Sequence, residues 1–104
     1  MRELQKKAYE TAKRRGQWEG GEAEAINHLI TEVGEYIKAI DAYESYFDGL
    51  ADVVGFKDAY KMVLEDTKPS ELADIVITAM SIAEHKGIDL GKAIELKMRY
   101  NEVR

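Results

Sequence analysis

Residues 68–86 read KPSELADIVITAMSIAEHK, and this stretch decides the fold of the chain. Placed at about 100° per residue, its apolar side chains cover well over half of the circumference of a helix. These side chains are Leu72, Ile75, Val76, Ile77, Ala79, Met80, Ile82 and Ala83. A helix that is apolar over most of its surface is buried on several sides. Because a small chain encloses such a helix poorly by itself, the sequence predicts that a second copy packs against it.

Two helices are predicted before this stretch. Residues 2–15 form the first, and a glycine-rich loop that carries Trp18 follows it. Residues 22–46 form the second, because apolar side chains recur in steps of three and four along one face. These side chains are Ile26, Leu29, Ile30, Val33, Ile37 and Ile40. Gly34 lies inside this helix, where glycine is roughly 1 kcal/mol less favourable than alanine, so we expect a close packing approach there.

The ends of the remaining helices carry capping residues. Asp66 or Thr67 suits the N-cap of the helix quoted above, and Pro69 suits its first turn. Gly87 ends that helix, and Asp89 caps a fourth helix that runs to the C-terminus. Together these elements predict an all-α bundle of four helices that is completed by homo-oligomerisation.

Composition and charge exclude several classes of protein. The length of 104 residues suffices for a single domain, 1–104, and an apolar fraction of 45% fits a folded protein. The net charge is −5 and the longest basic run is Lys13–Arg15, so we expect no nucleic-acid partner. The absence of cysteine excludes disulfides and thiolate chemistry. No apolar stretch approaches a membrane span and the N-terminus is not signal-like, so we expect no membrane association and a cytoplasmic location.

Two pairs of acidic residues stand on the second and third predicted helices. Glu32 and Glu35 form the first pair, and Glu71 and Asp74 form the second. Residues three apart project from one face of a helix, so each pair presents two carboxylates together. Antiparallel packing of the two helices brings the pairs together at the edge of the core. Carboxylates so placed repel one another unless protons or divalent cations neutralise them, and all-oxygen ligands suit Mg²⁺ or Mn²⁺ rather than zinc.

A purely structural explanation of these pairs stays open at this point. The chain has 20 acidic residues among 104, and such a composition produces pairs at this spacing by chance. Glu71 also stands in a first helical turn, where a carboxylate interacts favourably with the helix dipole. The spacing alone therefore does not establish a metal site.

Longer stretches around the two pairs resemble the MazG-like branch of the all-α NTP pyrophosphohydrolase superfamily. Residues 26–35, INHLITEVGE, look like the first metal helix of that family, and residues 66–77, DTKPSELADIVI, look like its second. Residues 84–90, EHKGIDL, and residues 97–104, KMRYNEVR, resemble its final helix. Gly16-Gln17-Trp18 stands where the family often has an aromatic loop. The resemblance covers nearly the whole chain.

This resemblance implies a reaction and a cofactor. The reaction is cleavage of a nucleoside triphosphate, or a related nucleotide, between the α and β phosphates to give the monophosphate and pyrophosphate. The resemblance implies that Mg²⁺, with Mn²⁺ as a substitute, is bound by Glu32, Glu35, Glu71 and Asp74. One of these carboxylates, Glu32 or Glu35, is then the candidate catalytic base. The family also implies a homodimer or a homotetramer.

Four candidate substrate-binding residues lie on the fourth predicted helix. Lys97, Asn101 and Arg104 share one face, and Tyr100 lies beside them. Lys and Arg suit phosphates, and Asn suits a base or a sugar. The alternative is a solvated face near a helix C-terminus, where cations are favourable in any case.

Two further candidate substrate-binding residues lie nearer the N-terminus. Trp18 suits stacking on a base, or packing against the first helix. His28 stands one turn before the first acidic pair, where it suits contact with substrate or metal, or a hydrogen bond inside the bundle. The tyrosines Tyr36, Tyr43, Tyr46 and Tyr60 are predicted to be packing or interface residues.

The segment between the acidic pairs is long for compact members of this family. Residues 47–64 are its least readable part, with a short helix predicted over residues 56–64. We interpret residues 47–64 as an insertion with a role in substrate access or assembly. Two rival functions stay open: a non-catalytic helical protein-interaction module, and a nucleotide-binding regulator that turns its ligand over poorly.

Overall fold

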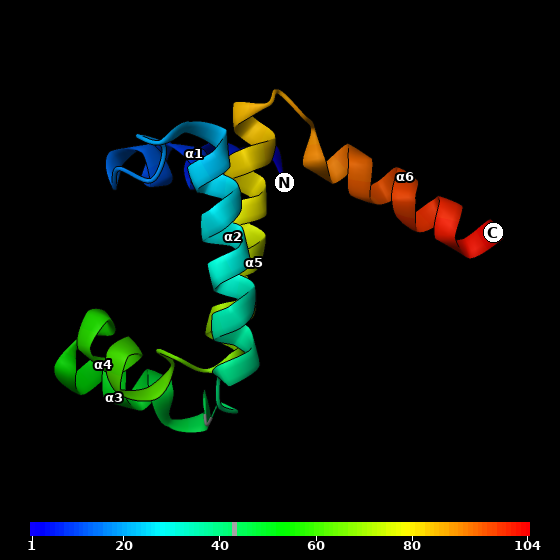
Figure 1. Ribbon diagram of the computed structural model, residues 1–104. Helices are drawn as coiled ribbons and strands as arrows, with labels where there is room; N and C mark the ends of the chain where they lie inside the picture. The colour runs from blue at the N-terminus through cyan, green and yellow to red at the C-terminus, as the bar shows by residue number, and fades with distance from the viewer. Residues whose placement is uncertain (43) are drawn as a thin grey trace. The chain divides into compact units, whose positions relative to one another are not determined.

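The computed structural model describes residues 1–42 and 44–104. Within these residues the chain is all-α, with no strand and an isolated parallel bridge between Ile40 and Thr67 (Figure 1). The helices are α1 (Arg2–Arg14), α2 (Gly21–Lys38), α3 (Phe47–Val54), α4 (Phe56–Val63), α5 (Lys68–His85) and α6 (Leu90–Val103), with a 3₁₀ turn η1 at Glu44–Tyr46. In the described part of the chain, none of these helices has the length and apolar character needed to cross a membrane.

The first, third and fourth predicted helices are confirmed as α1, α5 and α6. Pro69 lies in the first turn of α5, and Gly87 follows its end with a φ of +71°, a value that glycine adopts without steric strain. Asp89 is the N-cap of α6, where its side chain accepts a hydrogen bond from the backbone N–H of Lys92 at 3.2 Å.

The second predicted helix is too long, because α2 ends at Lys38 rather than at residue 46. Ile40 pairs instead with the segment that precedes α5. Its N–H donates to the carbonyl of Asp66 at 3.2 Å, and its carbonyl accepts from the N–H of Lys68 at 2.7 Å. Backbone groups engaged in these bonds cannot continue a helix. Tyr43, predicted as a packing or interface residue, lies outside the described residues.

The short helix predicted over residues 56–64 is confirmed as α4, and a second short helix that was not predicted, α3, precedes it. Gly55, with a φ of +91°, separates α3 from α4. The two helices pack through aromatic rings, and the centroids of Phe47 and Phe56 lie 5.8 Å apart. Tyr60 lies against both phenylalanines, and its hydroxyl is 2.6 Å from that of Ser70 in α5. Residues 47–64 are therefore tied to the first turn of α5.

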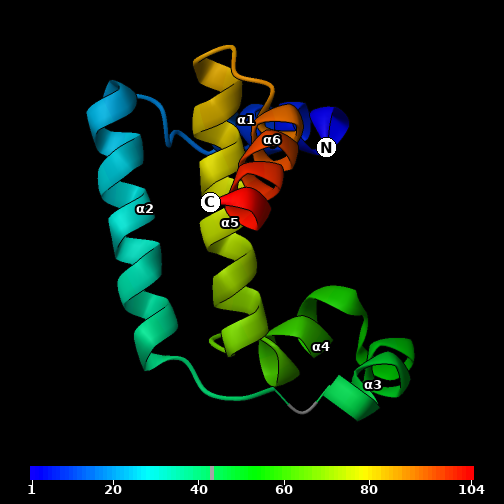
Figure 2. The ribbon, with the colours of Figure 1, turned by 90° about the vertical axis from the view of Figure 1, so that its right-hand side faces the viewer.

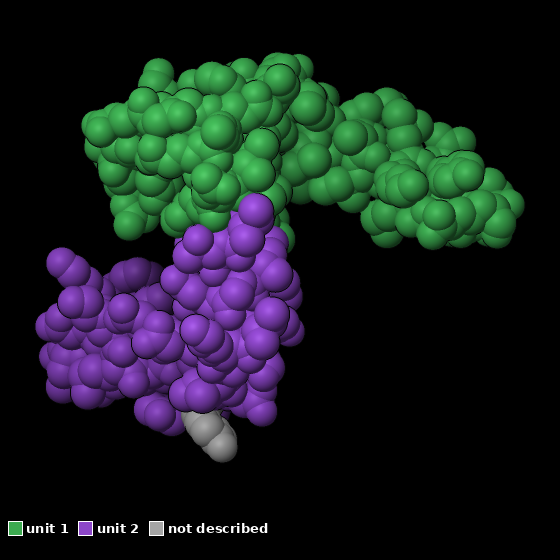
Figure 3. Space-filling view, viewed as in Figure 1, with its two compact units in different colours: residues 1–29, 76–104 green, residues 30–75 purple. Residues whose placement is uncertain are grey.

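The chain divides into two compact units, which Figure 3 colours separately. Unit 1 comprises residues 1–29 and 76–104, and unit 2 comprises residues 30–75. Helices α2 and α5 contribute residues to both units. The expectation that residues 1–104 form one domain stays a prediction.

The core of unit 1 is built from small side chains and one buried amide. Ala8, Ala12, Ala25 and Ala83 are buried, together with Met80. Gln5 is only 2% exposed. Its side-chain N–H₂ donates to Glu84 at 3.1 Å and to the carbonyl of Ile88, and its oxygen accepts from the N–H of Leu90 at 3.0 Å. The amide of Gln5 thus fastens α1 to the turn between α5 and α6.

We expect Gln5→Leu to lower the free energy of unfolding by roughly 2–4 kcal/mol. Leucine fills a similar volume but leaves the N–H of Leu90 and the carbonyl of Ile88 without their partner. Urea unfolding followed by circular dichroism measures the loss. The matched control is Lys6→Leu, an exposed position one residue further along α1, where we expect little change. Equal effects of the two substitutions would refute the role assigned to this amide.

The close approach expected at Gly34 is not seen. A Cβ built on Gly34 would meet no atom of the described structure within 4 Å. The space beside Gly34 is open in the single chain.

Candidate metal centre

The predicted metal residues all belong to unit 2. There, residues 30–38 of α2 and residues 68–75 of α5 run antiparallel beside each other, as Figure 2 shows. Each acidic pair has the three-residue spacing that places two carboxylates on one helical face. The antiparallel arrangement therefore brings the acidic pair of α2 next to the acidic pair of α5.

Three of the four predicted ligands gather at one point. Carboxylate oxygens of Glu32, Glu71 and Asp74 all lie within 4.8 Å of one another. Two of these residues come from α5 and the third comes from α2. The structure thus brings together residues that are separated by about forty positions in the sequence, as the antiparallel pairing of helices requires.

The two glutamates of this group are largely removed from water. Glu32 is 7% exposed and Glu71 is 6% exposed, whereas Asp74 is more open. Oε2 of Glu71 is buried and has no hydrogen-bond partner among the residues that the structure describes. Native proteins rarely bury a carboxylate oxygen without a partner, since its desolvation is then uncompensated. The buried oxygen of Glu71 therefore points to a cation or a proton.

Glu35, the fourth predicted ligand, lies beside the group of three but is not part of it. It is exposed at the surface, one turn along α2 from Glu32. When the carboxyl of Glu71 is protonated, it shares a hydrogen bond with the carboxylate of Glu35. Glu35 is thus in contact with the cluster and also accessible from solvent.

The surroundings of Glu71 raise its pKa from 4.5 to about 6. Burial is the largest cause, because it disfavours the charged carboxylate. The negative charges of Asp74, Glu35 and Glu32 follow in that order, and the hydrogen bond with Glu35 adds to them. The carboxylates therefore repel one another as the sequence predicted, and this repulsion contributes to the raised pKa of Glu71.

A cavity of about 340 Å³ opens beside the cluster within unit 2. Its lining contains Glu35 and Glu71 together with Lys38, Ala39 and Asp66. Lys38 and Asp66 were not among the predicted site residues. The sequence did contain a signal for Lys38, because Glu32, Glu35 and Lys38 stand at successive three-residue steps on α2. Asp66 offered no such signal, since backbone pairing with Ile40 places it.

The wall of this cavity is held by backbone hydrogen bonds. The bridge between Ile40 and Thr67 joins the end of α2 to the start of α5. Thr67 is 1% exposed, and its hydroxyl donates to the carbonyl of Leu64 at 2.6 Å. Asp66 has a φ of +67°, in the left-handed region that side-chain-bearing residues seldom occupy. The segment before α5 is therefore fixed in a less favourable conformation at the edge of the cavity.

Trp18 lies in unit 1, where its side chain is engaged by neighbouring residues. Its ring stacks on that of His85 with centroids 4.2 Å apart and planes inclined by 24°. Its indole N–H donates to the hydroxyl of Ser81 at 2.8 Å, and the ring of Tyr9 meets it edge-on at 5.5 Å. These contacts fit the packing interpretation of Trp18, and its role in substrate binding stays a prediction.

His28 also lies in unit 1, where it lines a cavity of about 50 Å³ together with Trp18, Thr78 and Ser81. Substrate binding by His28 is not tested by this arrangement.

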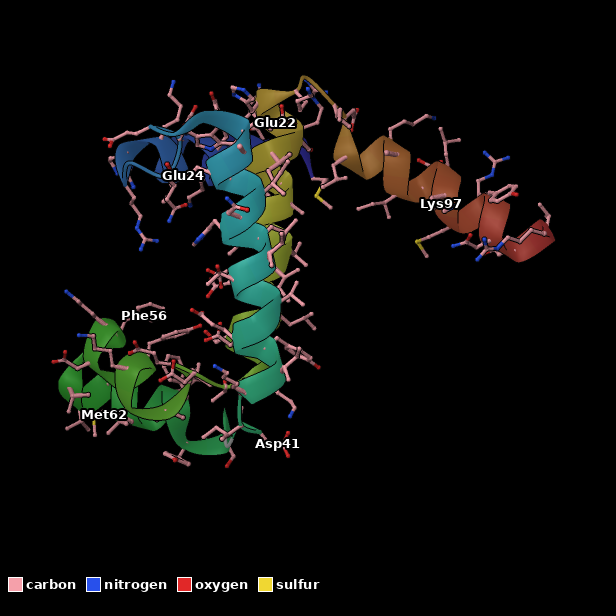
Figure 4. The ribbon with its side chains drawn as sticks, viewed as in Figure 1. Glu22, Glu24, Asp41, Phe56, Met62 and Lys97 are labelled. Carbon is pink, nitrogen blue, oxygen red and sulfur yellow. The ribbon has the colours of Figure 1, made fainter. Side chains whose placement is uncertain are left out.

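The four predicted substrate residues of α6 likewise belong to unit 1. Lys97 Nζ lies 5.1 Å from the centroid of the Tyr100 ring, and the guanidinium carbon of Arg104 lies 5.9 Å from it. Figure 4 labels Lys97 on this helix. Asn101 is exposed beside them. The structure thus gathers Lys97, Tyr100 and Arg104 on one exposed surface, where cation–π contacts order the two basic side chains.

Comparisons with known proteins give no assignment for this chain. No family model matches it, and neither a curated protein nor a solved structure matches it. The relation to the MazG-like family therefore stays a prediction from the sequence, and the functional argument depends on the geometry of the carboxylates.

Proposed function

We propose that this protein is a Mg²⁺-dependent nucleotide pyrophosphohydrolase whose metal site is formed by Glu32, Glu71 and Asp74 with Glu35 beside them. The observation that supports this proposal most strongly is the convergence of three carboxylates within 4.8 Å. The buried oxygen of Glu71 supports it further, because a cation supplies the partner that the described residues do not.

The donor set fits a hard divalent cation. All of its ligand atoms are carboxylate oxygens, and such sets bind Mg²⁺ or Mn²⁺ in preference to softer metals. The chain has no cysteine, and the cluster itself contains no histidine. When bound, such a cation neutralises phosphate oxygens and lowers the pKa of water in its coordination sphere. The carboxylates in turn fix where a triphosphate is able to bind.

Glu35 is the residue that we assign as the base. It contacts Glu71 and lines the cavity, but it stands outside the group of three and is exposed. A carboxylate in this place reaches both the buried ligands and the solvent that supplies the attacking water. Glu32, buried within the group, is better suited to hold the cation than to accept a proton from water.

The test of the proposed function is pyrophosphate release from a panel of canonical and modified nucleoside triphosphates. Each nucleotide is assayed with Mg²⁺, with Mn²⁺ and with EDTA. Release that requires the metal establishes the activity, and the preferred nucleotide identifies the substrate. If the folded protein releases no pyrophosphate from any nucleotide, the interaction module or the poorly active regulator becomes the better description.

We also propose that a second copy of this chain covers the exposed apolar side of unit 2. Ile30, Ile37 and Ile40 are 64%, 76% and 65% exposed, and Leu72 on α5 is 50% exposed. Ile30 and Ile37 stand two turns apart on one face of α2. A run of large aliphatic side chains left in water marks an interface more often than a free surface. This assembly is the homodimer or homotetramer that the sequence predicts.

Ile37→Glu is expected to shift the protein from an oligomer to a monomer at micromolar concentration. The change places a charge at the most exposed isoleucine of α2, where burial against a second copy would require its desolvation. Sedimentation or light scattering measures the mass. Lys6→Glu is the control, since Lys6 is an exposed polar residue of α1 in unit 1 and we expect no change of mass there. A wild-type protein that is itself monomeric would contradict the proposed assembly.

A further inference from the structure

The cavity of unit 2 is larger than a metal ion needs. Its volume is about 340 Å³. This volume falls within the range of small-molecule sites, about 300–1,000 Å³. Glu71 belongs both to the group of three carboxylates and to the cavity lining, and Glu35 in the lining contacts it, so a ligand in the cavity also meets a proposed metal ligand.

Lys38 is the cation in the lining of this cavity. It is exposed, and its ammonium forms no ion pair among the residues that the structure describes. Lys68, the other lysine near this wall, already donates to the carbonyl of Ala39 at 3.3 Å. The positive charge of Lys38 is therefore available to an incoming ligand, while that of Lys68 is engaged by the backbone.

Backbone hydrogen bonds fix the chain next to Ala39 and Asp66, two residues of the cavity lining. The bridge between Ile40 and Thr67 joins the end of α2 to the start of α5, and Thr67 is buried. Glu71, which also carries the buried oxygen without a hydrogen-bond partner, contributes to the cavity lining. The lining thus combines hydrogen-bonded backbone at its edge, the carboxylate of Glu71 and an exposed lysine that is accessible to an anion.

We propose that this cavity binds the pyrophosphate portion of the substrate, with Lys38 as the side chain that contacts its phosphate oxygens. The proposal deepens the proposed function and rests on it. A lysine ammonium binds phosphate as a point charge with three donors. The lining carries the carboxylates of Glu35, Asp66 and Glu71 against the single charge of Lys38, so it repels a free polyanion. The ligand is accordingly the Mg²⁺ complex of pyrophosphate and not the bare anion.

A simpler role for Lys38 predicts a different result. Lys38 is the last residue of α2, where a cation interacts favourably with the helix dipole. If that interaction were its whole role, replacement would lower helix stability slightly and leave ligand binding unchanged. The two roles are separated by measuring affinity for pyrophosphate, because the dipole interaction does not depend on the ligand.

The experiment is calorimetric titration of inorganic pyrophosphate into the protein, in excess Mg²⁺ and again in EDTA. Wild type is compared with Lys38→Ala, with Lys38→Arg and with Lys57→Ala, an exposed lysine of α4 outside the cavity lining. We expect Lys38→Ala to weaken binding by about 10- to 100-fold, the effect of losing one hydrogen bond to a charged group. Lys38→Arg should retain most of the affinity, Lys57→Ala should retain all of it, and EDTA should abolish binding to every variant.

Two results would overturn the proposal. One is pyrophosphate affinity that is equal in wild type and Lys38→Ala, with thermal melts showing that both are folded. The other is a wild-type protein that does not bind pyrophosphate in Mg²⁺. Failure of the proposed function is seen separately, in the nucleotide panel: a protein that binds pyrophosphate through Lys38 and hydrolyses no nucleotide would retain this site and lose the enzymatic assignment.

Discussion

Glu71→Gln is expected to reduce Mg²⁺-dependent pyrophosphate release by at least about 100-fold while raising the melting temperature of the metal-free protein. Both effects have one cause. Glutamine keeps the shape of Glu71 but removes a charge that Asp74, Glu35 and Glu32 repel and that burial disfavours. The neutral amide also weakens the group of three carboxylates that we propose as the metal site. Loss of activity together with a gain in stability is the signature of a functional carboxylate.

The measurement pairs a pyrophosphate-release assay with a thermal melt in EDTA. Glu65→Gln is the matched control, because Glu65 is an exposed glutamate of unit 2 that stands just before the segment leading into α5. We expect this control to change neither activity nor melting temperature appreciably. Full activity in Glu71→Gln would show that Glu71 is not a metal ligand. A lower melting temperature of this variant in EDTA would show that the charge of Glu71 does not destabilise the metal-free protein.

Stabilisation by Mg²⁺ is expected to be larger at about pH 7.5 than at about pH 5. The pKa of Glu71 is raised from 4.5 to about 6 in the folded protein. Below pH 4.5 the carboxyl is protonated in the folded and the unfolded chain alike, and its contribution to stability is fully present. As the pH rises from 4.5 to 6, the unfolded chain ionises first, so the free energy of unfolding of the metal-free protein falls.

A cation reverses this loss because it competes with the proton for Glu71. Above pH 6 the carboxylate is ionised and free to bind Mg²⁺, whereas near pH 5 the proton must first be displaced. At a concentration of 100 times Kd, a ligand that binds only the folded state adds about 2.7 kcal/mol to the free energy of unfolding. The pH dependence of the stabilisation by Mg²⁺ therefore reports on the protonation of the Glu71 carboxylate.

Urea unfolding across this pH range, with and without Mg²⁺ at constant ionic strength, measures the effect. Glu71→Gln serves as the control, since it has no carboxyl to titrate at this position, and its Mg²⁺ response should be small at every pH. A gain from Mg²⁺ that is the same in wild type at both pH values would argue against Glu71 as a ligand. If Na⁺ raised the free energy of unfolding as much as Mg²⁺ does, the effect would be general screening of charge and not metal binding.

The sequence alone determined the local features of this fold. Helical spacing predicted α1, α5 and α6 closely, and the ends of α5 and α6 followed from Pro69, Gly87 and Asp89. These predictions succeeded because spacing and capping act within a few residues along the chain. The same local spacing placed Glu32 and Glu35 on one face of α2, and it placed Glu71 and Asp74 on one face of α5.

Tertiary structure alone decided where α2 ends. Its periodic pattern continues beyond Lys38, but Ile40 forms backbone hydrogen bonds with Asp66 and Lys68, which lie far along the chain. The helix over residues 56–64 was predicted from the sequence, but its packing against α3 depends on contacts among Phe47, Phe56 and Tyr60. Figure 4 labels Phe56 at the start of α4, where Gly55 has turned the chain back.

For the candidate metal site, too, some features followed from the sequence and others from the tertiary structure. The sequence determined which carboxylates are available and how they are paired, because a three-residue step on a helix is a local property. Only the tertiary structure decided that Glu32 joins Glu71 and Asp74 while Glu35 stands aside, and that Lys38 and Asp66 share a cavity with them. The reason is physical: which charges meet, and which of them lose water, depends on how two antiparallel helices pack, and the pattern within one helix does not contain that information.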